Sequence, residues 1–164
     1  MQVCFIGHRT IEKSEELISS LKETIVQLIN KGATTFLFGS KSEFDTLSWE
    51  VVSQLKNKYA FVKRVLVRSA YQYISKAYEE YLLQSYEETF FPPKLENAGK
   101  CSYVERNYEM IEKSTYCIFY YNKNYIPPLK NQKLLSSSSN SGTKIAYEYA
   151  TKKNKQIINL YKQK

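Results

Sequence analysis

The opening stretch of the chain, residues 2–9 (QVCFIGHR), decides the fold, because a short apolar run there ends at a glycine, Gly7. A run of this kind is typical of a strand that is buried on both faces of a parallel sheet. His8 and Arg9 follow at once, and apolar residues at helical spacing run from Ile11 toward Gly32. We therefore expect a strand, a short polar loop and a helix, in that order.

The same alternation continues along the rest of the chain. Strand-like runs are residues 34–39, 60–67, 115–121 and 156–161, and helical spacing falls at residues 44–55, 73–86, 104–111 and 145–150. Five strands joined by helical crossovers predict an α/β, Rossmann-like three-layer α/β/α sandwich with a mainly parallel sheet. No repeat or boundary divides residues 1–164, so we expect one domain, with a long polar loop at about 122–140.

Composition is ordinary for a soluble globular protein of 164 residues, with 43% hydrophobic and 24% charged residues. No apolar run approaches the ~20 residues that span a bilayer, and no signal peptide is visible, so the sequence predicts a cytoplasmic protein. Cys4 and Cys117 lie in apolar runs and are expected to be buried thiols, whereas Cys101 lies apart from both. A single histidine excludes a multi-histidine metal site, and no cofactor is evident.

Positive charge is concentrated at the end of the chain. Residues 123–164 hold nine lysines against one acidic residue, Glu148, whereas the preceding residues are balanced. This asymmetry favours an anionic partner, either a nucleotide or a nucleic acid. The alternative is a solvated, lysine-rich tail with no ligand of its own.

Three loops are expected to meet at the carboxyl edge of the sheet, at residues 7–10, 39–43 and 136–143. Loops of small and polar residues in that position bind phosphate through backbone N–H groups. In the first loop, Gly7 allows close approach of a ligand, while His8 and Arg9 supply polar and cationic groups. The alternative is that Gly7 only ends a strand and His8 caps the next element.

The second and third loops add further candidates. Gly39 and Ser40 can form an anion-binding nest, and Asp45 either accepts hydrogen bonds from a ribose or complements the helix dipole. Ser141, Gly142 and Thr143 precede a helical stretch, so a phosphate could bind there. The spacings of a P-loop and of the G-x-G-x-x-G fingerprint are both absent.

These residues together resemble the SLOG superfamily, a Rossmann-like group that includes the Lonely-guy phosphoribohydrolases and the DNA-processing protein of natural transformation. Within that superfamily, the chain looks like the YpsA-like branch of bacterial and phage proteins. The resemblance rests on residues 4–9 (CFIGHR), 38–45 (FGSKSEFD), 86–92 (YEETFFP), 106–111 (RNYEMI), 141–150 (SGTKIAYEYA) and 157–160 (IINL).

The resemblance implies a nucleotide-derived ligand, and a dimer is common among the relatives. Arg106 with Asn107 matches the family's R-K-x-x-M motif, and Glu148 falls at the spacing of its catalytic glutamate. Ser40 and Ser141 stand where the family pattern has glycine, and Lys41 and Glu43 stand where it has small residues.

Three hypotheses result from the sequence. The first is binding or sensing of a nucleotide-like ligand by the three loops together with Arg106 and Asn107. The second is an N-glycosidic hydrolase of nucleoside 5′-monophosphates, in which Arg106 and Glu148 are catalytic. The third is a single-stranded nucleic-acid binder that uses the lysine-rich final quarter.

Overall fold

The structure is a computed structural model that describes residues 1–39, 42–126 and 141–162. It is built around one six-stranded sheet in the order β4-β3-β2-β1-β5-β6, and all neighbouring strands are parallel. The strands are β1 (Gln2–Gly7), β2 (Thr35–Phe38), β3 (Lys63–Val67), β4 (Glu88–Phe90), β5 (Tyr116–Tyr120) and β6 (Gln156–Asn159). The predicted Rossmann-like α/β class is therefore confirmed.

The α-helices are α1 (Glu15–Asn30), α2 (Glu43–Leu55), α3 (Lys76–Leu83), α4 (Ser102–Lys113) and α5 (Gly142–Lys152). Two short 3₁₀ turns, η1 (Pro93–Leu95) and η2 (Gly99–Cys101), precede α4. Serine side chains define where four of the α-helices begin, because each accepts a hydrogen bond from a backbone N–H of the first turn. These serines are Ser14, Ser42, Ser75 and Ser141.

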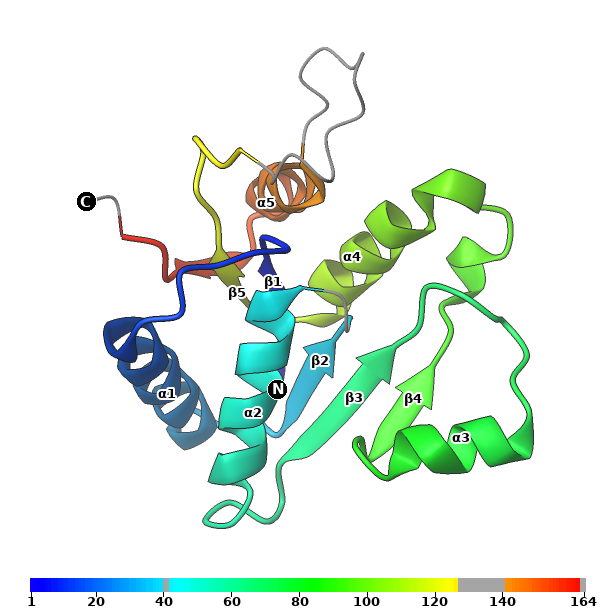
Figure 1. Ribbon diagram of the computed structural model, residues 1–164, viewed down its shortest axis with the longest axis horizontal. Helices are drawn as coiled ribbons and strands as arrows, with labels where there is room; N and C mark the ends of the chain where they lie inside the picture. Colours follow the sequence, from blue (N-terminus) through cyan, green and yellow to red (C-terminus); the bar gives the residue numbers. More distant parts are fainter. Residues whose placement is uncertain (40–41, 127–140, 163–164) are drawn as a thin grey trace.

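The helices form a layer on each face of the sheet. Apolar side chains of α1 and α2 pack with Val3, Phe5 and Phe36 on one face, and those of α4 and α5 pack with Cys4 and Leu37 on the other. Figure 1 shows α1 and α2 together on one side of the strands, with α4 and α5 on the opposite side. Side chains that alternate along each strand thus build two separate cores.

The sheet has one strand more than the sequence indicated. We expected a helix over residues 73–86 and no strand after it, whereas α3 ends at Leu83 and β4 pairs with β3. A strand of three residues is too short to show a period of two, so the pattern gives no signal for it. Figure 1 shows β4 at the edge of the sheet, beside α3.

The expected burial of the two thiols is confirmed. Cys4 and Cys117 are register partners on β1 and β5, and both are fully buried and free. Burial, together with the neighbouring Cys117, raises the pKa of the Cys4 thiol well above its usual value. Both groups therefore act as small core side chains, while Cys101 is exposed.

Strand order places a topological switch point between β1 and β5. The chain moves outward from β1 through β2 and β3 to β4, then returns to the other side of β1 for β5 and β6. Loops that leave β1 and β5 therefore diverge toward opposite sides at the carboxyl edge. In open α/β sheets, ligands bind in the crevice at this position.

Candidate functional site at the carboxyl edge of the sheet

His8 lies at the switch point and joins the two diverging loops. The backbone N–H of Asn122, just after β5, donates to His8 Nε2 at 2.9 Å, and the Asn122 carbonyl oxygen lies 3.1 Å from the same nitrogen. The imidazole is stacked on the ring of Tyr125, with centroids 3.9 Å apart and planes 10° apart. His8 is thus buried between segments that are 114 residues apart in the sequence.

The environment of His8 keeps its ring neutral. Burial lowers the pKa of His8 to about 4, although the hydrogen bond to the Asn122 backbone acts in the opposite direction. The tautomer decides which Asn122 contact forms: Nε2 accepts from the N–H when the ring proton is on Nδ1, and Nε2–H donates to the carbonyl oxygen in the other tautomer. At neutral pH His8 therefore presents a flat, uncharged ring and one N–H donor.

Arg9 connects the β1 loop to the start of α2. Its carbonyl oxygen accepts a hydrogen bond from the backbone N–H of Glu43 at 2.9 Å. The Glu43 carboxylate in turn accepts from the N–H of Ile11, also at 2.9 Å. This reciprocal pair of hydrogen bonds holds the loop in place, and the Arg9 side chain extends into solvent.

Gly7 has a packing role. A Cβ at this position would lie 2.5 Å from the Cβ of Phe44, a fully buried residue of α2. Glycine is therefore required for α2 to approach the end of β1. The sequence hypothesis that Gly7 makes room for a ligand receives no support from this geometry.

Gly39, Asp45 and Arg106 form a buried polar cluster at the end of β2. The Gly39 N–H donates to Asp45 Oδ1 at 3.0 Å, and its carbonyl oxygen accepts from Arg106 at 2.5 Å. Asp45 and Arg106 are 5% and 7% exposed. Ser40, predicted to share this loop's anion nest, lies outside the described residues.

The Arg106 guanidinium is only partly satisfied by this cluster. Its second amino group donates to Asn107 Oδ1 at 3.0 Å, but Nε is buried without a partner among the described residues. Burial lowers the pKa of Arg106, and the nearby Asp45 carboxylate counteracts that shift. Arginine remains charged under such conditions, so the buried guanidinium keeps one unused donor, Nε, beside Gly39.

The start of α5 differs electrostatically from the start of α2. Glu43 and Asp45 occupy the first turn of α2, so that helix dipole is already complemented by carboxylates. The first turn of α5 has no acidic residue, and Ser141 Oγ accepts from the Lys144 N–H at 3.2 Å. A phosphate would therefore meet no carboxylate in the first turn of α5.

Two residues of the α5 start complete the predicted set. Gly142 is exposed, and no atom lies within 4 Å of the position that its Cβ would take. Thr143 is buried, with 7% of its surface exposed. Residues 136–140 of the predicted third loop lie outside the described residues, and the part that is described is exposed at Gly142 and buried at Thr143.

Glu148 and Arg106, which the hydrolase hypothesis pairs, have different surroundings. Glu148 is 60% exposed on α5 and forms an ion pair with Lys144 at 3.8 Å. Arg106 lies on α4 and is buried against Gly39. No contact joins Arg106 to Glu148 in the described part of the chain. The catalytic assignment of this pair remains a prediction.

Several lysines of the final quarter have intramolecular partners. Lys155 donates to the carbonyl oxygens of Glu112 and Ser114 at 2.9 Å each, which fixes the end of α4. Lys153 and Lys162 form ion pairs with carboxylates of α4 and α1. Part of the positive charge therefore holds elements together.

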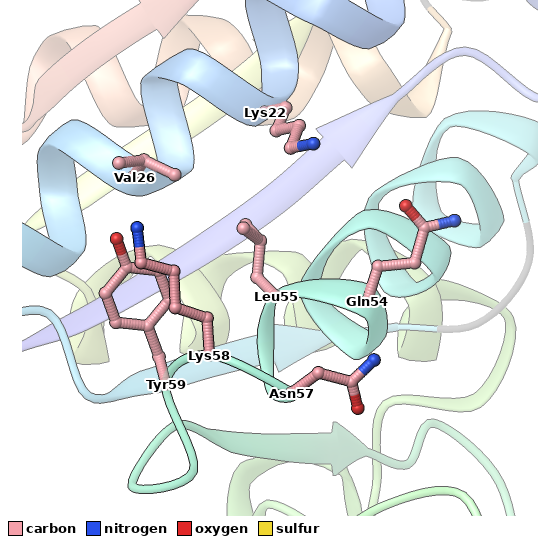
Figure 2. A pocket seen from close by; sticks show the side chains of 7 residues that line it. All are labelled: Lys22, Val26, Gln54, Leu55, Asn57, Lys58 and Tyr59. Carbon is pink, nitrogen blue, oxygen red and sulfur yellow. The ribbon is translucent and has the colours of Figure 1, made fainter.

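A separate groove lies between α1 and the C-terminal end of α2, at the end of these helices that is away from the carboxyl edge of the sheet. It has a volume of about 550 Å³ and is lined by Lys22, Val26, Gln54, Leu55, Asn57, Lys58 and Tyr59. Figure 2 shows these side chains around the space between α1 and the end of α2. Because both helices run back from the carboxyl edge, this groove is remote from the candidate site.

Sequence reasoning missed Asn122 and Tyr125, which contact His8. Both lie at the start of the long polar loop, where no apolar spacing marks a buried residue. Within residues 1–39, 42–126 and 141–162, no cluster of His, Cys, Asp or Glu could hold a metal ion. No α-helix in these same ranges has the length and apolar character needed to cross a membrane.

No family model matches the chain, and no curated protein matches it. Among solved structures, DNA processing protein A from Helicobacter pylori is similar, with a TM-score of 0.52 and 18% identity. The match covers 96% of this chain and 63% of that one, so the chain spans less than two thirds of its relative. That protein is described by its single-stranded DNA binding mode. The likeness independently supports a Rossmann-like fold for this chain.

Proposed function

We propose that the chain binds a nucleotide or a nucleotide-derived ligand at the carboxyl edge, with its phosphate near Arg9 and the first turn of α5. The observation that carries this proposal is the switch point between β1 and β5, where such folds bind ligands. The exposed guanidinium of Arg9 and the acid-free start of α5 both favour an anion beside it. Arg106 and Asp45 hold the neighbouring loop in place through hydrogen bonds to the backbone of Gly39.

Thermal unfolding in the presence of nucleotides tests this function. A ligand that binds only the folded state stabilises it by RT ln(1 + [L]/Kd), which is about 2.7 kcal/mol at one hundred times Kd. We expect at least one phosphate-bearing nucleotide, in a millimolar panel, to raise the melting temperature. The Arg9→Gln variant should lose that rise, because it removes an exposed cation without disturbing the core.

Lys58→Gln serves as the matched control, since it removes one positive charge at the remote groove. That variant should keep the full rise in melting temperature. A panel of mono-, di- and trinucleotides and dinucleotide cofactors that produces no shift in the wild type would overturn the proposed function. Release of free base from a bound monophosphate, abolished by Glu148→Gln, would extend it to hydrolysis.

Single-stranded DNA is a second candidate ligand, favoured by the solved relative and by the lysine excess of residues 123–164. Fluorescence anisotropy with a labelled oligothymidine should then show affinity that falls steeply between 50 and 200 mM salt. Arg9→Gln should weaken this binding as well, if DNA phosphates use the same edge. Absence of binding at low salt would remove this candidate and leave the first unaffected.

A further inference from the structure

Two buried polar atoms at the switch point have no hydrogen-bond partner among the described residues. They are Nδ1 of His8 and the hydroxyl oxygen of Tyr125. Buried polar groups in folded proteins are nearly always hydrogen-bonded, so each exception needs a reason. The two side chains are stacked on each other, so both exceptions belong to one pair of rings at the switch point.

We propose that the ring of Tyr125 occupies the position in which the planar base of the ligand binds. When the ligand binds, Tyr125 moves away and the base stacks on the face of the His8 ring. This subsite rests on the proposed function and names the part of the nucleotide that it recognises. It also assigns His8 as a binding residue. The phosphate stays on the side of Arg9, the next residue in the chain.

The geometry of His8 suits an aromatic ligand. Its neutral ring already makes one parallel contact, with ring centroids 3.9 Å apart. Asn122 holds the ring by its backbone, and that hydrogen bond does not depend on Tyr125. Nδ1 then remains available for a hydrogen bond with a polar atom of the ligand, as donor or acceptor according to the tautomer.

The backbone N–H of Tyr125 donates to the Asn122 carbonyl oxygen at 3.1 Å, but its side-chain hydroxyl has no hydrogen-bond partner among the described residues. Its hydroxyl gains a hydrogen bond to water on leaving, because none is made inside. The next residue, Ile126, is 76% exposed, so it does not anchor the segment. The arrangement in which Tyr125 covers His8 therefore competes with the ligand. The apparent affinity equals the intrinsic affinity multiplied by the fraction of molecules in which Tyr125 has moved away.

Calorimetric titration with AMP and with ribose 5-phosphate tests the proposal, because only AMP carries a base. Tyr125→Ala should bind AMP about threefold to tenfold more tightly than the wild type, and ribose 5-phosphate equally well. Tyr125→Phe keeps the ring but removes the unsatisfied hydroxyl, so it should bind AMP more weakly than the wild type. Tyr73→Ala, at a tyrosine that is 85% exposed, is the matched control and should change neither affinity.

The outcomes separate the two proposals. If ribose 5-phosphate binds every variant but neither Tyr125 variant changes the AMP affinity, the base subsite is wrong and the phosphate site stands. Weaker AMP binding by Tyr125→Ala would also overturn the subsite. If neither compound binds any variant, nucleoside monophosphate binding itself fails. Circular dichroism of each variant identifies a loss of fold, and the Phe variant preserves the test in that event.

Discussion

Gly39 leaves room for the guanidinium group of Arg106, which packs against the loop that contains Gly39. A Cβ at this position would lie 2.6 Å from the guanidinium carbon of Arg106, although Gly39 does not have the positive φ that favours glycine. The requirement comes from α4, which lies more than sixty residues further along the chain. At this scale the candidate site is a set of loops whose positions are set by buried polar contacts.

Gly39→Ala should therefore destabilise the fold by about 1–3 kcal/mol, because either the guanidinium or the loop must move. Urea unfolding monitored by circular dichroism would measure the change. Gly142→Ala is the matched substitution, since its Cβ would enter open space, and it should alter the free energy of unfolding by less than about 0.5 kcal/mol. Equal effects of the two substitutions would contradict the packing role of Gly39.

Individual site residues were predictable only in part. The run that ends at Gly7 indicates that His8 and Arg9 follow a strand, which places them at the carboxyl edge. Asn122 and Tyr125, which contact the His8 side chain, are 114 residues or more away in a polar loop without periodicity, so no local pattern identifies them. Long-range contacts of polar side chains leave no trace in the spacing of apolar residues.

Strand β4 has only three residues, so its pairing with β3 depends on side-chain contacts as well as on backbone hydrogen bonds. Glu87, just before it, accepts from the Arg64 backbone N–H at 2.6 Å and from the Arg64 guanidinium at 2.7 Å. Burial would raise the pKa of Glu87, but these hydrogen bonds and Lys56 outweigh it and lower the pKa to about 2. The carboxylate thus fastens β4 to β3 at the edge of the sheet.

Glu87→Gln should destabilise the fold by about 1–2 kcal/mol at pH 7, since hydrogen bonds to a charged group are replaced. The folded-state pKa lies below the ordinary value of 4.5, so the stabilisation is present above that value and is lost as the pH falls toward 2. Urea unfolding should show that the difference in free energy of unfolding between wild type and variant is smaller at pH 3 than at pH 7.

Glu88→Gln is the control for this effect. Glu88 pairs with Lys63 at 2.6 Å, but both side chains are more than half exposed, so its loss should cost well under 1 kcal/mol. A gap for Glu87→Gln that is independent of pH would contradict the assigned role of its carboxylate. The element most dependent on this ion pair is also the one that the sequence pattern missed, because three residues cannot display a period.

At the scale of the whole molecule, strand order creates the candidate site. The alternation of strands and helices predicts a parallel sheet, and that prediction is confirmed. Which strands are neighbours does not follow from the alternation, so the position of the switch point required the structure. The lysine-rich end illustrates the same limit: it predicts an anionic partner, yet Lys153, Lys155 and Lys162 contact other elements of the chain.

The most direct test of ligand binding at the switch point is a ¹H–¹⁵N NMR titration of the wild type with AMP at saturating concentration. We predict that the largest chemical-shift changes fall on the backbone amides of Arg9, Gly142 and Thr143. Changes confined to Lys22, Asn57 and Lys58, which line the remote groove, would contradict a site at the carboxyl edge.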